Sequence, residues 1–458
     1  MSSRWKKLLY ATAGVLVALV VAHLVVTRVS HVEPPAIARP DGELQRLPNG
    51  ERRFGRSRAT KLGNIWLVEL QGTPEEIGYA HSRLLYGEMV ENEGKLYGEL
   101  DRHVPLWPLR RLLLDVAQLR YRNVGSGMSD ARRREIAAGA LGFTPDPYED
   151  RFPTYQRFLY LNALYDISLS FEHSPLIGCT TFTFSGAAAE NGHALLARNF
   201  DFEVDDVFDR GKAVFVVRET GKIPFASVAW PGLAGVVSGM NEAGVAIVVH
   251  GGRAGQPVTR GEPVVHALRR VLSTARNSDE AVRALAEGEP MVSHIVIVTD
   301  AKGKAEVVER VPGRPQFVRP LPERAVVTNH FEGPAAEDPK NLRVRQQTST
   351  LPRAERGKEL IRALDHPATP KDAVRLLRDR KGAGGADLPL GDRRAIDALI
   401  ATHGVVFDTT ARTLWVSEGP HLLGRFLGLT LSPEVAPAEN IPADPLLSSP
   451  EYRKLPKH

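Results

Sequence analysis

The sequence predicts an α+β fold in which layered β-sheets are covered by helices. Helical patterns dominate from about residue 73 to Glu172, and a series of short β-type segments begins after Gly178. Helices and strands then return in turn along the rest of the chain, and this order suggests sheets packed in layers beneath helices. Of the 458 residues, 43% are apolar, which is enough for a large core in one domain or two.

The chain begins with a basic flank and an apolar segment, and we predict a signal or membrane anchor over residues 1–28. Arg4, Lys6 and Lys7 precede an uncharged apolar run from Leu8 to Thr27, about the length that a helix needs to cross a bilayer. Because the basic flank lies on the N-terminal side, this end is expected in the cytoplasm. Everything after Arg28 is then extracytoplasmic, in the periplasm or on the outer face.

Export with cleavage is the alternative to a retained anchor. Val20 and Ala22 are small enough for a signal-peptidase site, and cleavage before His23 would release a secreted protein. Residues 29–55 contain four prolines and mixed charges. We therefore expect an extended tether there between the membrane and the folded part.

The next segment, residues 56–178, is expected to be mainly helical. Ile65 to Leu70 is apolar enough for a strand, and the sequence from Gly72 to Gly78 then opens a helix. Thr73 is the expected N-cap of this helix, and Pro74 suits its first turn because a proline there loses no helical hydrogen bond.

Residues 179–458 are expected to form the sheet-rich segment. Turn sequences at 190–192 and 241–244 predict hairpin connections, and the proline-rich end after Ser432 predicts a wrapping tail. Strands are expected at 180–185, 193–198, 213–218, 225–229, 236–239, 244–250, 293–299 and 305–310 and in a closing hairpin at 404–417, and helices at 264–275, 279–286 and 352–365.

The charge pattern argues against nucleic acid as a partner. The formal net charge is +5 and the pI is near 9.2, but acidic and basic residues are mixed through most of the chain and no basic low-complexity tail is present. One basic concentration, from Trp107 to Arg134, is interleaved with leucines. Two interpretations stay open for it: a segment that lies against anionic lipid or covers an acyl-binding cleft, and an ordinary surface helix with a leucine face.

Cys179 is the only cysteine of the chain. A lone thiol cannot form an intrachain disulfide or a four-ligand zinc site, so any chemical role for it is that of a single reactive sulfur. The alternative is a small buried apolar side chain. An oxidising compartment gives a modest reason for the absence of all other cysteines.

Several motifs resemble one enzyme family. They are Gly178-Cys179-Thr180-Thr181, Arg198-Asn199-Phe200-Asp201, the segment from Gly239 to Val245, Thr328-Asn329-His330-Phe331, the helix opening between Leu70 and Leu85, and the closing hairpin from Val405 to Gly419. In this order they resemble the penicillin (isopenicillin N) acyltransferase family of N-terminal nucleophile hydrolases, and more distantly choloylglycine hydrolases and acid ceramidase. The resemblance implies a four-layer αββα sandwich and covers most of the chain beyond the tether.

The resemblance also implies self-processing. The chain would be cut between Gly178 and Cys179, so that Cys179 becomes a new N-terminus and residues 179–458 a separate chain that stays associated with the preceding one. A free α-amine titrates near pH 7.7–8 and a thiol near 8.5, so the amine can take the proton of its own thiol without a histidine. Gly178 suits the step because a residue without Cβ tolerates distorted geometry.

Five further residues receive catalytic roles by resemblance. Asp201 would hold the α-amine, and Arg198 would favour the thiolate and orient the substrate. Asn241 would donate to the oxyanion, and Asn329 matches the family's other active-site amide. Arg353 matches a Ser-x-x-Arg pattern loosely, since Thr350 replaces the serine and Pro352 intrudes. Without the cysteine, Arg198 and Asp201 would be taken for a surface ion pair, and Asn241 is also ordinary turn chemistry.

The predicted function is therefore hydrolysis or transfer of an acyl group on a linear amide, through a thioester on Cys179. An acyltransferase that uses a thioester donor is the alternative within this chemistry, and an inactive membrane-tethered binding domain is the alternative from another class. The expected partners are a small N-acyl amide, with a weak preference for a lipidic acyl group, and the membrane through the N-terminal helix. No metal or other cofactor is expected. Bile conjugates, N-acyl amino acids, ceramide-like lipids and β-lactams all stay open as substrates.

Overall fold

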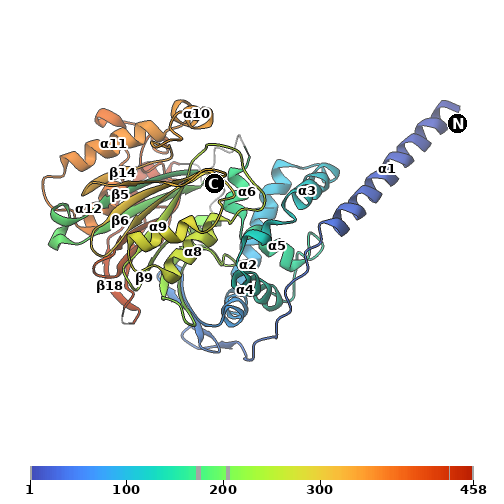
Figure 1. The fold of residues 1–458 in the computed structure, drawn as a ribbon, viewed down its shortest axis with the longest axis horizontal. Helices are drawn as coiled ribbons and strands as arrows, with labels where there is room; N and C mark the ends of the chain where they lie inside the picture. Colours follow the sequence, from blue (N-terminus) through green and yellow to red (C-terminus); the bar gives the residue numbers. More distant parts are fainter. Residues whose placement is uncertain (1–2, 172–176, 203–206, 433, 456–458) are drawn as a thin grey trace.

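Two β-sheets stacked face to face form the centre of the molecule (Figure 1). The computed structural model describes residues 3–171, 177–202, 207–432 and 434–455. The larger sheet has eleven strands, in the order β1-β2-β3-β4-β7-β8-β9-β10-β11-β12-β13, and the smaller has seven, in the order β14-β5-β6-β15-β16-β17-β18. Within the described residues, the one parallel contact between strands joins β4 to β7, and the other paired strands are antiparallel.

The strands of the larger sheet are β1 (Gln45–Arg46), β2 (Arg52–Phe54), β3 (Ser57–Leu62), β4 (Ile65–Gly72), β7 (Ala213–Glu219), β8 (Phe225–Ala229), β9 (Ser238–Asn241), β10 (Ala246–Gly251), β11 (His294–Thr299), β12 (Ala305–Arg310) and β13 (Phe317–Pro320). Those of the smaller sheet are β14 (Arg324–Val327), β5 (Ile177–Phe184), β6 (Leu195–Phe202), β15 (Ala401–Asp408), β16 (Thr413–Ser417), β17 (Phe426–Thr430) and β18 (Ala436–Ile441).

Helices cover both outer faces of the stacked sheets. The main helices are α1 (Ser3–Val29), α2 (Pro74–His103), α3 (Trp107–Tyr121), α4 (Asp130–Gly142), α5 (Thr154–Leu161), α6 (Leu164–Leu169), α8 (Val264–Thr274), α9 (Ser278–Ala286), α10 (Pro339–Gln347), α11 (Thr350–Ala363) and α12 (Pro370–Leu377). Two short helices, α7 (Val207–Arg210) and α13 (Pro450–Arg453), complete the set.

Three apolar clusters define the layers. Residues of α8, α9 and α2 pack against one face of the larger sheet, and residues of α11 and α12 pack against the outer face of the smaller sheet. Between the sheets lies a third cluster, in which Val216 and Val248 of the larger sheet meet Val405 and Leu429 of the smaller one. The predicted α+β class with an αββα sandwich is therefore confirmed, and a further bundle of α2, α4, α5 and α6 lies beside it.

The predicted local signals match the elements that form. Thr73 caps α2, and a reciprocal bond from its backbone to the Glu76 side chain completes a capping box. The turn between β5 and β6 contains Asn191 with φ of 56°, in the left-handed region that asparagine tolerates. Gly244, with φ of 85°, closes the turn between β9 and β10. Both hairpins stand where the turn sequences predict them.

Some elements were not expected. Strands β1 and β2 lie inside the segment assigned to the tether, so its C-terminal part belongs to the larger sheet. The segment assigned to a wrapping tail contains β18, an edge strand with a mostly exposed face. Its sequence lacks apolar alternation and contains Pro437, which a sheet tolerates only at an edge. This absence of alternation is why sequence patterning does not detect the strand.

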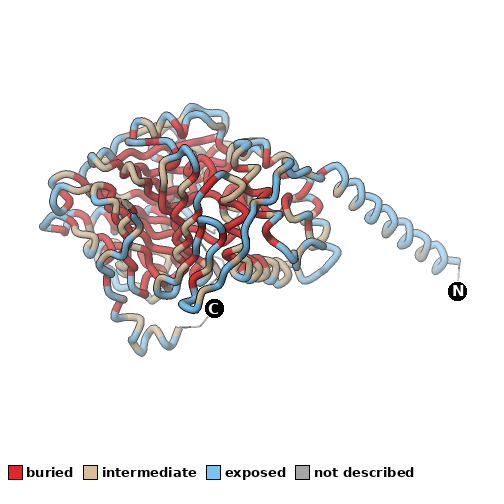
Figure 2. The backbone as a smooth tube through the Cα atoms, turned by 90° about the horizontal axis from the view of Figure 1, so that it is seen from below, coloured by how far each residue is buried: buried red, intermediate tan, exposed pale blue. Residues whose placement is uncertain are grey.

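The N-terminal helix α1 leaves the folded body and is exposed along most of its length (Figure 2). It is long and apolar enough to cross a membrane, with a mean hydropathy of 2.3 over its most apolar stretch. Only its C-terminal part contacts another helix, α3 (Figure 1). A signal sequence and a membrane anchor both have this form.

Candidate active site

Cys179 lies on β5 with its side chain between the two sheets. It is fully buried and pairs with Phe200 on β6, while Thr181 pairs with Arg198. Paired residues of an antiparallel ladder share a face, so these four side chains point the same way. The Thr181 hydroxyl lies 2.7 Å from Nε2 of His250 on the larger sheet, which identifies this face as the inner one.

Arg198 holds the Cys179 thiol from the same face. Its Nη2 donates to Sγ of Cys179 at 3.3 Å and to the Val249 carbonyl at 2.7 Å. Its Nη1 donates to the hydroxyl of Ser238, which lies 3.0 Å from Nε2 of His403. Burial raises the pKa of the Cys179 thiol, and the positive charge of Arg198 opposes that rise. The guanidinium therefore favours the thiolate at a fully buried position.

Asp201 lies on the opposite face of β6 and faces the cleavage position. It pairs with Gly178, and a Cβ on Gly178 would stand 3.3 Å from Oδ2 of Asp201 and 3.7 Å from Nη2 of Arg353. Burial raises the pKa of Asp201 to about 7, although the charge of Arg353 lowers it. Within the described residues, Oδ1 of Asp201 has no hydrogen-bond partner. A buried carboxyl with a free oxygen thus lies beside the Gly178–Cys179 bond.

Asn329 and Arg353 contact the backbone of Cys179. Oδ1 of Asn329 accepts from the Cys179 amide at 2.7 Å and from Nη2 of Arg353 at 2.9 Å. Nη1 of Arg353 donates to the carbonyl oxygen of Cys179 and, at 2.9 Å, to the hydroxyl of Thr180. The Thr180 amide donates to Oδ1 of Asn199 at 2.7 Å. Side chains thus hold the backbone of the nucleophile candidate on both sides of its Cα.

Short-range contacts position these two side chains. Asn329 lies two residues after the end of β14, and its Nδ2 donates to the Gly251 carbonyl at 3.0 Å. Its backbone amide donates to the Thr350 hydroxyl at 2.9 Å, at the start of α11. Arg353 lies in the first turn of the same helix, and Pro352 is accommodated there because the first helical turn needs few amide donors. The threonine of the loose Ser-x-x-Arg match therefore contacts Asn329.

Asn241 is not brought to this cluster. Its Nδ2 donates to the carbonyls of Leu272 and Ala275 at 2.9 and 2.7 Å, and its Oδ1 accepts from the Val245 amide at 2.9 Å. It lies three residues beyond Ser238 on β9, about 10 Å along the strand. The amide that was expected at the oxyanion thus holds a turn to the end of α8, which is the ordinary turn chemistry named as its alternative.

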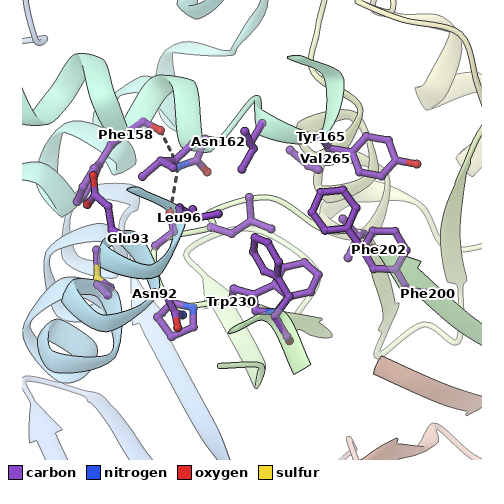
Figure 3. Close-up of a pocket in the computed structure, with 18 residues that line it drawn as sticks. Asn92, Glu93, Leu96, Phe158, Asn162, Tyr165, Phe200, Phe202, Trp230 and Val265 are labelled. Atoms are coloured by element: carbon purple, nitrogen blue, oxygen red, sulfur yellow. Dashed lines mark hydrogen bonds between the residues drawn. The ribbon is translucent and has the colours of Figure 1, made fainter. Parts of the chain in front are cut away.

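An apolar cavity opens beside Phe200, the strand partner of Cys179 (Figure 3). It contains about 860 Å³ of empty space, including its open mouth. Its walls come from both segments of the chain: Met89, Leu96, Phe158, Leu161 and Leu164 before Cys179, and Phe202, Phe208, Trp230, Leu233, Val237 and Val265 after it.

Few polar groups reach this cavity. Asn162 is occupied, since its Nδ2 donates to the carbonyls of Phe158 and Gly232 at 3.0 Å each (Figure 3). The buried Tyr165 hydroxyl and Nδ2 of Asn92 have no hydrogen-bond partner among the described residues. Burial raises the pKa of Tyr165, and the nearby charge of Cys179 adds to that rise. Tyr165 thus lines the cavity and carries a hydroxyl without a described partner, close enough to Cys179 for the charge there to affect its pKa.

Sequence reasoning missed four residues around the thiol: Tyr165, Ser238, His250 and His403. Tyr165 belongs to the helical segment before Gly178, and it stands in no motif. His250 is fully buried, and burial holds its pKa well below the usual value. Ser238 is buried on β9 within hydrogen-bond distance of Arg198. None of these positions has a local pattern that would have distinguished it.

A cysteine near the start of a strand, inside a sandwich of two sheets between helices, is the arrangement of the N-terminal nucleophile hydrolases. The chain belongs to one family of that class. The model of the acyl-coenzyme A:6-aminopenicillanic acid acyl-transferase family matches residues 188–417, half of the chain. The matched region includes Arg198, Asp201, Asn329 and Arg353 and begins after Cys179.

Other similarities are more distant. An uncharacterized protein from Archaeoglobus fulgidus is 28% identical over 265 residues, which cover 53% of this chain and 42% of that relative's length. An ortholog of N-acylethanolamine-hydrolyzing acid amidase from Caenorhabditis elegans is 17% identical over 51% of this chain and 93% of its own, with a TM-score of 0.37. Penicillin V acylase from Agrobacterium tumefaciens is 20% identical over 52% of this chain and 82% of its own, with a TM-score of 0.36. A conjugated bile acid hydrolase from Clostridium perfringens is 11% identical over 57% of this chain and 96% of its own, with a TM-score of 0.38.

Proposed function

We propose that Cys179 is the nucleophile of a self-processing amidohydrolase that cleaves a linear amide through an S-acyl-cysteine intermediate. The observation that carries the proposal is the convergence of three side chains on one residue: Arg198 on its sulfur, Asn329 on its nitrogen and Arg353 on its carbonyl oxygen. A structural cysteine needs none of these polar contacts, and burying two guanidinium groups costs free energy unless their charge is used. Family membership supports acyl chemistry as the use.

In the proposed maturation step, Sγ of Cys179 attacks the carbonyl carbon of Gly178. The bond from that carbon to the Cys179 nitrogen breaks, the nitrogen takes a proton, and Gly178 is left as a thioester on the sulfur. Water then hydrolyses the thioester to a Gly178 carboxylate and a free thiol. Asp201, with its pKa raised to about 7 and its side chain beside Gly178, is the proposed donor of the proton to the leaving nitrogen; solvent takes the proton of the thiol and returns one to Asp201, so that the proton count balances.

In the proposed turnover, the new α-amine takes the thiol proton and the thiolate attacks the amide carbonyl of the substrate. The amine product leaves with a proton, and water releases the acid from the thioester. Arg198 stabilises the thiolate, and Oδ1 of Asn329 keeps the α-amine oriented toward it. Asp201, once ionised, balances the charge of a protonated α-amine.

The apolar cavity supports an apolar acyl group. It lies next to Phe200 on the same face as the thiol, so an acyl chain on Sγ would extend into it. Aromatic and aliphatic walls supply most of the affinity for such a chain, and the walls carry few polar groups. The proposed substrate is therefore an amide of an apolar carboxylic acid.

Acyl transfer is the second candidate, because the family description names an acyl-transferase that uses coenzyme A thioesters. The two candidates share every step up to the thioester on Cys179. They differ in whether water or an amine then attacks the thioester and takes the acyl group. Product analysis separates them: a processed enzyme is supplied with an N-acyl amide or an acyl thioester, with and without an acceptor amine, and the ratio of acid to new amide is measured.

We also propose that α1 is a retained anchor that leaves the rest of the protein outside the cytoplasm. Basic residues at its start and its apolar stretch support this orientation. Carbonate extraction of membranes, followed by protease treatment of intact and opened cells, tests both parts. Release into the medium of a protein that lacks the N-terminal residues of α1 would instead identify α1 as a cleaved signal.

The decisive experiment is intact mass and N-terminal sequencing of the wild-type chain beside Cys179→Ala and Cys179→Ser. We expect a new N-terminus at Cys179 in the wild type and an uncut chain in Cys179→Ala. Serine retains a weaker nucleophile, so slow cleavage is expected there. An uncut wild-type chain that also fails to hydrolyse N-acyl amides would overturn the proposal and favour an inactive binding domain.

A further inference from the structure

Helix α3 exposes apolar side chains and buries polar ones, the reverse of a helix on a water-soluble protein. Leu109, Leu112, Leu113 and Val116 follow the i, i+3, i+4, i+7 spacing of a single helix face. Leu112 is 51% exposed and Val116 is 55% exposed, and Trp107 at the start of the helix is 67% exposed. We call Leu109, Leu112, Leu113 and Val116 the leucine face of α3. Apolar residues gathered on one exposed face mark a site of contact with an apolar partner.

The opposite side of α3 faces the protein and is polar. Asp115, Gln118 and Tyr121 are its buried residues. The Tyr121 hydroxyl lies 2.5 Å from the hydroxyl of Ser170, and the Gln118 carbonyl accepts from the Tyr160 hydroxyl at 3.3 Å. These contacts fix the rotation of α3, so the leucine face cannot turn inward without breaking them.

Helix α3 also contacts His23, the one titratable imidazole in the apolar run of α1 from Leu8 to Thr27. Nδ1 of His23 lies 3.0 Å from the Asp115 carboxylate, and its Nε2 lies 2.8 Å from Nη2 of Arg111. An imidazole without a partner is costly in a bilayer, and such groups are found paired. The pair His23–Asp115 therefore sets where α3 stands along α1.

The contact with His23 places α3 near one surface of a bilayer that α1 would cross. His23 lies sixteen residues after Lys7, about 24 Å along a helix that rises 1.5 Å per residue. With Lys7 at one surface of a hydrocarbon core about 30 Å thick, His23 lies close to the opposite surface. Helix α3 is then at that surface, and a groove lined by Val26 of α1 and Trp107 and Val116 of α3 continues the apolar surface from one helix to the other.

We propose that the leucine face of α3 rests on the lipid bilayer that α1 enters, as an interfacial helix. Trp107 suits the boundary between headgroups and acyl chains, and the exposed Arg120 and Arg122 suit anionic headgroups. The inference uses α1 as an anchor and is independent of the chemistry at Cys179. Of the two interpretations that the sequence allows for the basic, leucine-rich segment from Trp107 to Arg134, the proposal favours contact with anionic lipid.

Site-directed spin labelling tests this placement on the full chain. In a Cys179→Ala background, which leaves no other thiol, Leu112→Cys and Val116→Cys each carry a nitroxide, and Lys302→Cys at an exposed hairpin turn on β11–β12 is the matched control. The proteins are reconstituted in vesicles of phosphatidylcholine and phosphatidylglycerol. Collision with oxygen, which concentrates in lipid, is compared with collision with a water-soluble nickel chelate.

We expect the labels at 112 and 116 to collide more with oxygen than with the nickel chelate, and the label at 302 to show the opposite. Equal exposure to nickel at 112, 116 and 302 would overturn the proposal. Protection from both reagents, with dipolar coupling between labels, would also overturn it, because the leucine face would then be covered by a second copy of the chain. Two labelled positions guard against one substitution that disturbs folding.

Discussion

The backbone amide of Cys179 donates a hydrogen bond to Oδ1 of Asn329, at 2.7 Å. The same oxygen accepts from Nη2 of Arg353 at 2.9 Å, so one amide oxygen joins the nitrogen of the nucleophile candidate to a buried cation. Because the proposed self-processing would convert that amide nitrogen into an amine, Asn329 is bonded to the atom whose chemistry would change. This relationship makes Asn329 a direct test of the mechanism.

Replacement of Asn329 by alanine is expected to slow self-processing by about 100-fold or more, since three buried side-chain hydrogen bonds worth about 1–3 kcal/mol each are lost. The rate is measured from the time course of the shortened chain on a denaturing gel. Asn329→Asp keeps an acceptor oxygen and is the matched control, with a smaller effect expected. Processing of the alanine variant at the wild-type rate would remove Asn329 from the mechanism.

Replacement of Arg198 by glutamine is expected to raise the pKa of the Cys179 thiol further, because the charge that opposes the effect of burial disappears. The pH dependence of thiol modification by a small methanethiosulfonate reagent reports this pKa. Arg198→Lys retains the charge and should give a midpoint closer to that of the wild type. An unchanged midpoint in the glutamine variant would mean that the guanidinium does not act on the sulfur.

Replacement of Gly178 by alanine tests the space at the cleavage position. The added Cβ would stand 3.3 Å from Oδ2 of Asp201, a tight contact with a side chain that can move slightly. We expect a folded protein, destabilised by about 1–3 kcal/mol, with slower processing because Asp201 is displaced. Thermal unfolding and the time course of cleavage measure the two effects. Loss of folding would show that the glycine is needed for packing instead.

Replacement of Leu96 by tryptophan is expected to shorten the apolar cavity. For N-acyl amides with long acyl chains we expect kcat/KM to fall by about tenfold or more, while short-chain substrates are less affected. Leu141→Trp, at an exposed leucine outside the cavity, is the control. If kcat/KM falls equally for long and short acyl chains, the cavity does not bind the acyl group. The assignment of Cys179 as the nucleophile would not be affected.

The unfolding free energy of a Cys179→Ala chain is expected to fall as pH rises from about 6.5 to 8. Burial raises the pKa of Glu93 and Asp201 to about 7 and that of Asp166 to about 8, so each binds its proton more tightly when folded. Stability from such groups is lost as pH rises through the folded pKa.

Below pH 6.5 buried histidines act in the opposite direction. Burial lowers the pKa of His81, His266 and His294 to about 3, so stability from them is lost as pH falls and the unfolded chain takes up protons. Between about pH 5 and 6.5 the three carboxyls and the three histidines offset one another, so denaturant titration should show little pH dependence there and a decline in stability between 6.5 and 8. In Asp166→Asn the decline above 6.5 should be shallower, and an identical slope would contradict the assignment.

The sequence was most informative where chemistry and local pattern coincide. Cys179 stands out as the only thiol, and Asn329 and Arg353, predicted from separate motifs, do converge on its backbone. The capping box at Thr73 and both hairpin turns follow from side-chain rules that act over a few residues. Such short-range signals can be predicted from the sequence because the residues that form them are only a few positions apart.

Long-range placement was harder to predict. Arg198 and Asp201 were expected to flank the nucleophile, and the sequence did not show how: they lie three apart on β6 and so on opposite faces, one at the sulfur and one beside Gly178. Asn241 carries the right amide, yet its partners are the carbonyls of Leu272 and Ala275, which no local pattern indicates. Tyr165 reaches the site only through the packing of α6 against β6.

The parallel ladder between β4 and β7 joins a strand that precedes Cys179 to one that follows it, with pairs from Trp66–Ala213 to Gly72–Glu219. Scission before Cys179 would leave the larger piece with no covalent link to α1. The piece that bears the thiol would then be kept at its compartment by noncovalent contacts alone, as one subunit of a heterodimer: the β4–β7 ladder, the shared apolar core and buried ion pairs such as Arg132–Glu219. Separation of the two pieces would also divide the walls of the apolar cavity between them.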